Sequence, residues 1–174
     1  MTVTADRQAT RPLTVLVVGA VGGMIAGMMM AAVEMIYGWL SEAHSFWDAP
    51  MAIWAWVAGI DNFGEPADHV SAIVLGIIGH MMMSAMVGIV FAALMFYIVK
   101  ARDIVMPIVG GTAYGLLVWV VMRYLILPLN DGEAELFTKD LVSPQWVWWL
   151  AHAVLGMTAG IFYLTVRRRL RGQA

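Results

Sequence analysis

Apolar residues fill four long stretches of the chain, and most polar residues gather in the gaps between them. The stretches cover residues 13–40, 70–99, 104–127 and 146–166. Each reaches the roughly 20 residues that a helix needs to cross the ~30 Å hydrocarbon layer of a bilayer. The pattern predicts an all-α membrane protein with four transmembrane helices in a single domain, residues 1–174.

Positive charges mark one set of the gaps. Lys and Arg residues precede the first stretch, separate the second from the third and follow the fourth, whereas the other two gaps contain only Lys139. Short loops rich in Lys and Arg remain on the cytoplasmic side of a membrane. We therefore expect both termini and the loop at 100–103 in the cytoplasm, and the gaps at 41–69 and 128–145 outside.

Composition leaves little room for anything beside the helices. Of the 174 residues, 61% are hydrophobic, the mean hydropathy is +0.80, and there is no cysteine. Disulfides and thiolate chemistry are thereby excluded, and nucleic-acid binding has no support because basic residues occur mainly at the cytoplasmic ends.

The first outer gap predicts a further short helix. In the segment at 46–59, Asp48 is suited to a helix start and Pro50 to its first turn. We expect this helix to lie at the outer membrane surface, where indole rings are enriched. The predicted interfacial anchors are Trp47, Trp54, Trp56, Trp146, Trp148 and Trp149.

Small residues recur at four-residue steps, which places them on one stripe of each helix and lets helix backbones approach closely. The predicted packing positions are Gly19, Gly23, Gly27, Ser84, Gly88, Gly111, Gly115, Gly156 and Gly160. The first and third stretches match at an offset of 88 residues, and the second and fourth at an offset of 72. This similarity predicts two helical hairpins repeated in parallel, although glycine-rich membrane helices also resemble one another without duplication.

Four ionisable residues fall within the apolar stretches, where they are energetically costly and are usually paired or functional. They are Glu34, His80, Arg123 and His152. Counting helical rise from the charged helix ends puts all four in the outer half of the membrane or at its outer surface. We expect one polar cluster near the outer mouth of the bundle, with Glu34 and Arg123 as an ion pair.

The two histidines leave open whether the protein binds a cofactor. His80 and His152 could ligate a b-type haem, or could bind a transition metal with Glu34. The alternative is hydrogen bonding between helices, which we favour because the estimated depths of the two rings differ by roughly 8 Å. Methionine runs at 28–30 and 81–83 do not suggest a Cu(I) site, because consecutive helical side chains point about 100° apart.

The chain has a glycine-rich first stretch, a tryptophan-bearing segment after it, a histidine in the second stretch and the sequence Val-Met-Arg-Tyr-Leu-Ile-Leu-Pro at 121–128. In these features it resembles a family of small four-helix proteins of the bacterial inner membrane, the YagU-like proteins. The resemblance covers most of the chain. It implies the four-span fold and the inner membrane. It implies no catalytic role for any residue of this chain.

These features favour an accessory or structural subunit, not an enzyme, within a larger respiratory or other energy-transducing membrane complex. Its partners would be membrane lipids and other integral membrane subunits, and the acidic outer loops could attract a cationic periplasmic protein. Two alternatives remain: an electron-transfer subunit using His80 and His152, and a small transporter or channel lined by the polar cluster.

The orientation can be tested with topology reporters. Reporters that are active only in the cytoplasm should work when fused after Ala174 or within 100–103, because the positive-inside rule retains these segments there. Fusions within 60–68 and 130–140 should instead activate a periplasmic reporter. The reversed pattern would contradict the orientation.

Overall fold

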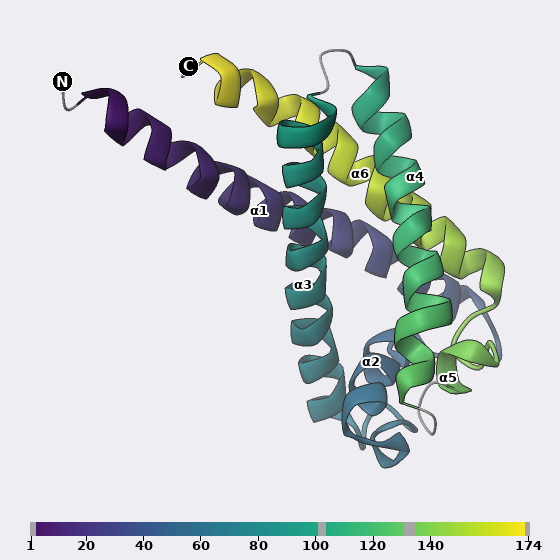
Figure 1. Cartoon of the computed structure of the whole chain (residues 1–174). Helices are drawn as coiled ribbons and strands as arrows, with labels where there is room; N and C mark the ends of the chain where they lie inside the picture. Colours follow the sequence, from purple (N-terminus) through teal and green to yellow (C-terminus); the bar gives the residue numbers. More distant parts are fainter. Residues whose placement is uncertain (1–2, 101–103, 131–134, 173–174) are drawn as a thin grey trace.

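The chain folds almost entirely into helices. The computed structural model describes residues 3–100, 104–130 and 135–172, and no β-strand occurs among them. The long helices are α1 (Val3–Leu40), α3 (Val70–Ala93), α4 (Val105–Val121) and α6 (Gln145–Gly172) (Figure 1). The predicted all-α class is therefore confirmed.

The described residues contain four helices that are long and apolar enough to cross a membrane. These spans are Pro12–Leu40, Val70–Val99, Val105–Leu129 and Gln145–Arg167, close to the predicted stretches. A π-helical turn, η2 (Leu94–Val99), extends α3; α4 continues through the π-helical turn η3 (Met122–Ile126) and the 3-10 turn η4 (Leu127–Leu129).

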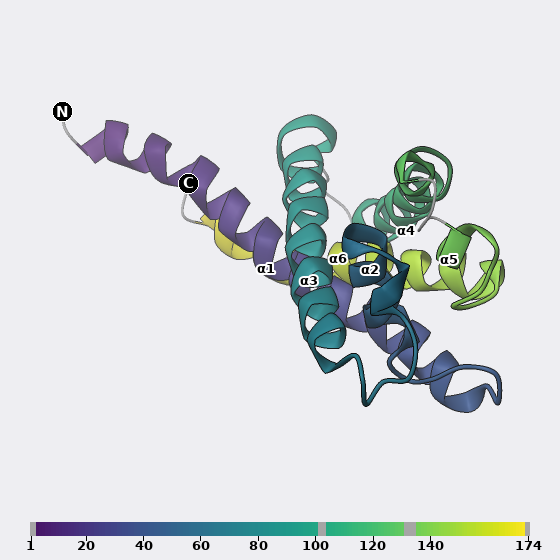
Figure 2. The same ribbon diagram turned by 90° about the horizontal axis from the view of Figure 1, so that it is seen from below.

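The long helices form an open wedge. Helix α1 packs against both α3 and α6, and α4 packs against α6. Helices α3 and α4 stand apart toward the end of the molecule that carries α2, in both views (Figures 1 and 2). Nearer their other ends, the Tyr114 hydroxyl donates a hydrogen bond to the Val87 carbonyl at 2.9 Å. This hydrogen bond joins α4 to α3 beyond the region where the two helices diverge.

Glycines bring the helix backbones into direct contact. Gly23 of α1 lies against the Ser84 carbonyl and the Gly88 Cα of α3. In the same way, Gly111 of α4 lies against the Gly156 carbonyl and Gly160 Cα of α6. A side chain at any of these glycines would overlap backbone of the opposite helix, so the close approach requires the missing Cβ.

A short helix, α2 (Asp48–Ala58), closes the wide end of the wedge. It begins in the predicted segment, and its residues Pro50, Met51, Ala52 and Ala55 are buried. The Pro50 carbonyl lies directly on Gly76 of α3, again where a Cβ would not fit. Helix α2 therefore packs onto the bundle along one whole face.

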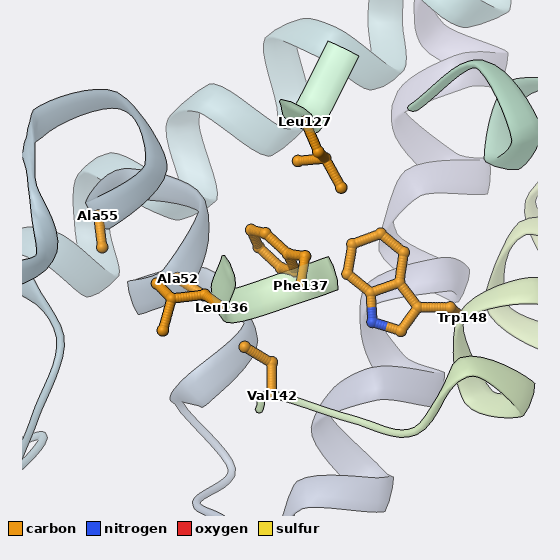
Figure 3. Packing of buried hydrophobic residues seen from close by; sticks show 7 residues of the cluster. All are labelled: Ala52, Ala55, Leu127, Leu136, Phe137, Val142 and Trp148. Carbon is orange, nitrogen blue, oxygen red and sulfur yellow. The ribbon is translucent and has the colours of Figure 1, made fainter. Parts of the chain in front are cut away.

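The segment between α4 and α6 also folds back onto the bundle. It contains α5 (Glu135–Thr138), whose Phe137 packs edge-to-face on Trp148 with ring centroids 4.7 Å apart. The apolar core at this end is drawn in Figure 3 and consists of Ala52, Ala55, Leu127, Leu136, Phe137, Val142 and Trp148.

Two of the tryptophans predicted as interfacial anchors, Trp148 and Trp56, take part in the core or in hydrogen bonds at this end of the bundle. Trp148 is only 7% exposed, because α5 covers it. The indole N–H of Trp56 donates to the Leu127 carbonyl at 3.2 Å, and the side-chain amide of Asn130 donates to the Trp56 carbonyl. Trp47, Trp146 and Trp149 are exposed, and Trp54 packs partly buried beside Met51.

The backbone contact between α1 and α3 can be tested by adding a single methyl group. Gly88→Ala should destabilise the protein by about 1–3 kcal/mol, because the new Cβ meets backbone that cannot move aside. Thermal unfolding in detergent measures this loss. The matched control is Gly79→Ala on the same helix, where a Cβ meets only the Ile53 side chain at 3.9 Å. Equal melting temperatures for the two variants would contradict the assigned contact.

Candidate functional site: a methionine-lined cavity

A cavity of about 660 Å³ occupies the wide end of the wedge. All four long helices contribute to its wall, and α2, α5 and η4 add residues at its end. The cavity exists because α3 and α4 diverge while α1 and α6 remain tightly packed behind them. Its walls are formed mostly by membrane-spanning segments.

Methionine is the commonest residue of the cavity wall. Six thioether side chains contribute to it: Met28, Met30, Met35, Met81, Met83 and Met122. Within both methionine runs the outer two residues line the cavity, and the middle ones, Met29 and Met82, do not. The flexible thioether gives such a wall an adaptable shape.

Glu34 is the acidic group of the cavity wall. Its side chain is only 8% exposed, and its Oε2 accepts a hydrogen bond from the Ser143 hydroxyl at 2.6 Å. Its Oε1 is buried and has no hydrogen-bond partner among the described residues. One carboxylate oxygen is thus left unsatisfied in an apolar environment, which is energetically unfavourable.

Both predicted histidines also line this cavity. His80 bonds through Nε2 to the Gly27 carbonyl at 3.0 Å, and His152 bonds through Nδ1 to the Trp148 carbonyl at 2.8 Å. A carbonyl oxygen only accepts, so each of these nitrogens must carry the hydrogen. In the neutral rings, Nδ1 of His80 and Nε2 of His152 therefore keep a lone pair.

The indole of Trp148 completes the polar wall. It stacks on the His152 ring with centroids 5.9 Å apart, and its Nε1 is buried without a partner among the described residues. Trp148 belongs to the cavity lining. Its Nε1 and the Ser84 hydroxyl, which also belongs to the lining, are donors beside three acceptor groups.

Arg123 lies outside this group, and the predicted ion pair with Glu34 is wrong. The guanidinium pairs with Asp140 at 3.3 Å and donates to the Phe137 carbonyl. Helix α5 and the segment after it pack near the end of α4 and bring these oxygens to Arg123. Only Oε2 of Glu34 is bonded from the same segment, through the hydroxyl of Ser143.

Straight-helix depth estimates do not decide whether the two histidines reach the same site. They separate His80 from His152 by roughly 8 Å of rise, yet both rings line one cavity. Rise along a helix measures depth only when the helices are parallel. Here α3 and α6 run in clearly different directions (Figures 1 and 2).

Among the described residues, no three His, Asp or Glu side chains come close enough to hold a metal ion together. His80 and His152 each retain one nitrogen that could bind a cofactor. Three contributors were not predicted from the sequence: Ser143, Trp148 as a cavity residue, and the methionines as a common wall. Their clustering depends on how segments far apart in the chain pack together.

No family model, curated protein or solved structure matches the chain.

The Glu34 contacts can be tested by double-mutant cycles. Ser143→Ala and Glu34→Gln should each destabilise the protein, and the double variant should lose less than the sum, because the two side chains share one buried hydrogen bond. The expected coupling is about 0.5–3 kcal/mol in detergent unfolding.

The matched cycle uses Arg123→Leu with Glu34→Gln. Its losses should add, since the two groups bond to different partners. Coupling in this second cycle together with additivity in the first would contradict the assigned contacts.

Proposed function

We propose that the protein is an accessory subunit that works by packing against the helices of another integral membrane protein in a larger complex. Respiratory and other energy-transducing assemblies of the bacterial inner membrane are the candidate complexes. The observation that carries the proposal is an uncovered helix face on α3.

That face is a regular apolar stripe. Its members recur at four-residue steps and are between 50% and 66% exposed: Val74, Ile78, Met82, Met86 and Val90. The small-residue stripe lies at other positions of the same helix, where Ser84 and Gly88 contact α1 and Gly76 contacts α2. Two methionines in the stripe make it adaptable to a partner surface.

The proposed internal repeat suggests why this face of α3 is uncovered. Its support is that equivalent residues make equivalent contacts: Gly88 lies against the Gly19 carbonyl, and Gly160 lies against the Pro107 carbonyl. The pairs are related by the same offsets of 88 and 72 residues that relate the sequences. In this reading, α1–α3 and α4–α6 are two copies of one hairpin.

The two copies differ in what covers them. Phe162 of α6 rests on Gly22 of α1. The repeat makes Val90 the equivalent of Phe162 and Gly110 the equivalent of Gly22, yet Val90 is 51% exposed and the side chains nearest to Gly110 belong to Met95 and Met106. One copy of a helix-packing surface is therefore used within the chain, and the other is left for a partner helix.

The negative charge of the segment at 41–69 suits a second kind of contact, with a soluble partner. The segment at 41–69 contains no Lys or Arg, and its carboxylates Glu42, Asp61, Glu65 and Asp68 are exposed. In the proposed orientation, with α2 at the outer membrane surface, these groups face the periplasm. They would favour approach of a cationic soluble partner by long-range attraction.

Site-specific photocrosslinking in native membranes tests the helix contact. A photoreactive residue at Met86 should give a crosslink to a distinct integral membrane protein, identified by mass spectrometry, because this position lies in the middle of the stripe. The matched control is Ile161 on α6, which is 46% exposed but outside the stripe. The crosslinked protein should also co-purify in mild detergent, and a Met86→Trp variant should weaken that association.

Equal labelling from both positions, or crosslinks only to a second copy of the chain, would contradict an accessory role. An optical spectrum of the same purified sample separates the electron-transfer alternative. A Soret band lost on His152→Gln would replace the association proposal with haem binding through the two histidines.

A further inference from the structure

We propose that the cavity binds a lipid-soluble molecule that has an apolar body and a head group that donates hydrogen bonds. A fatty alcohol and a fatty amine share this chemistry. The proposal rests on the cavity wall alone and is independent of the partner helix proposed above.

The size and lining of the cavity fit such a ligand. Its volume of about 660 Å³ lies within the roughly 300–1,000 Å³ that is usual for small-molecule sites. Nearly all of its wall is aliphatic, aromatic or thioether surface, and the polar side chains are few and grouped around Glu34 and the two histidines. This separation of apolar and polar wall matches a ligand that has an apolar body and one polar end.

The cavity opens at the side of the bundle. Its exposed large apolar lining residues are Met28, Ile36 and Ile77 of α1 and α3, which are 61%, 49% and 39% exposed, and Phe46 just before α2, which is 36% exposed. Met28 lies well inside the span Pro12–Leu40, so the opening reaches a level that lipid chains surround. A ligand dissolved in the bilayer can enter there without crossing water.

Acceptors outnumber donors on the polar wall, which selects the head group. Glu34 Oε1, His80 Nδ1 and His152 Nε2 can each accept a hydrogen bond, while Trp148 Nε1 and the Ser84 hydroxyl can each donate one. A purely apolar occupant would leave Glu34 Oε1 and Trp148 Nε1, which are buried without a partner among the described residues, unsatisfied, and an unpaired buried polar atom is energetically costly. A hydroxyl or ammonium head supplies the missing donor.

The occupant must also fill space. A single metal ion would leave most of the volume empty. Water is a poor occupant over most of the wall, because an ordered buried water requires two to four polar partners. A molecule that joins an apolar chain to a donor head satisfies both parts of the cavity.

Quenching of tryptophan fluorescence by bromine-labelled probes tests binding, because Trp56 and Trp148 both line the cavity. The full-length protein is placed in lipid nanodiscs and titrated with a dibrominated fatty alcohol, the corresponding amine and the corresponding methyl ether. We expect saturable quenching by at least one donor probe and at least tenfold weaker binding of the ether. The alcohol and amine arms identify the preferred head group.

Two variants locate the bound molecule. Ala32→Phe fills the apolar part of the cavity and should abolish saturable quenching. Glu34→Gln should weaken the preferred donor probe about tenfold, the loss of one charge-assisted hydrogen bond. The matched control is Glu42→Gln, an exposed carboxylate beyond the end of α1, which should leave binding unchanged.

Equal affinity for the ether and the donor probes would overturn the head-group assignment. Unchanged binding in Ala32→Phe, or non-saturable quenching by all probes, would overturn the site itself. If Glu34→Gln fails to fold, the ether comparison in the unmodified protein still tests donor selectivity. Crosslinking from Met86 is a separate measurement, so failure of either proposal leaves the other standing.

Discussion

Direct backbone contact between glycines is the constraint on which the rest of this structure depends. Gly23 meets Gly88 across α1 and α3, and Gly111 meets Gly156 across α4 and α6, with no Cβ between the helices. Within lipid there is little hydrophobic gain from burying one apolar helix against another, so close van der Waals packing must supply the attraction. These two contacts make two rigid helix pairs, and the remaining geometry follows from how the pairs meet.

The pairs are joined mainly through α1 and α6, and this asymmetry creates the cavity. Because α1 packs on both α3 and α6, the opposite helices α3 and α4 are free to diverge. They meet where Tyr114 bonds to Val87, and α2 closes the wide end by packing on Gly76. A closed bundle of four equivalent contacts would have no such space. The same asymmetry leaves the stripe around Met86 uncovered.

Most polar side chains inside the spans are hydrogen-bonded to backbone or loop groups, and those that are not fully bonded point to function. His80 and His152 each donate to a backbone carbonyl, and Arg123 is bonded by α5 and the segment that follows it. Glu34 differs, because Ser143 satisfies only one of its oxygens. The unsatisfied oxygen belongs to a residue of the cavity wall, beside two imidazole lone pairs. A cavity with these properties is organised for a ligand that brings a donor.

The sequence by itself determined the spans and the short helix between the first two, because length, hydropathy and Pro50 act locally along the chain. It also singled out the glycine stripes and three of the four residues expected in the polar cluster. The partners of those residues were decided only by tertiary structure. Ser143 reaches Glu34, and Asp140 reaches Arg123, because a loop folds back over the helix ends. His80 and His152 share one cavity because their helices are inclined, and helical rise carries no information about inclination.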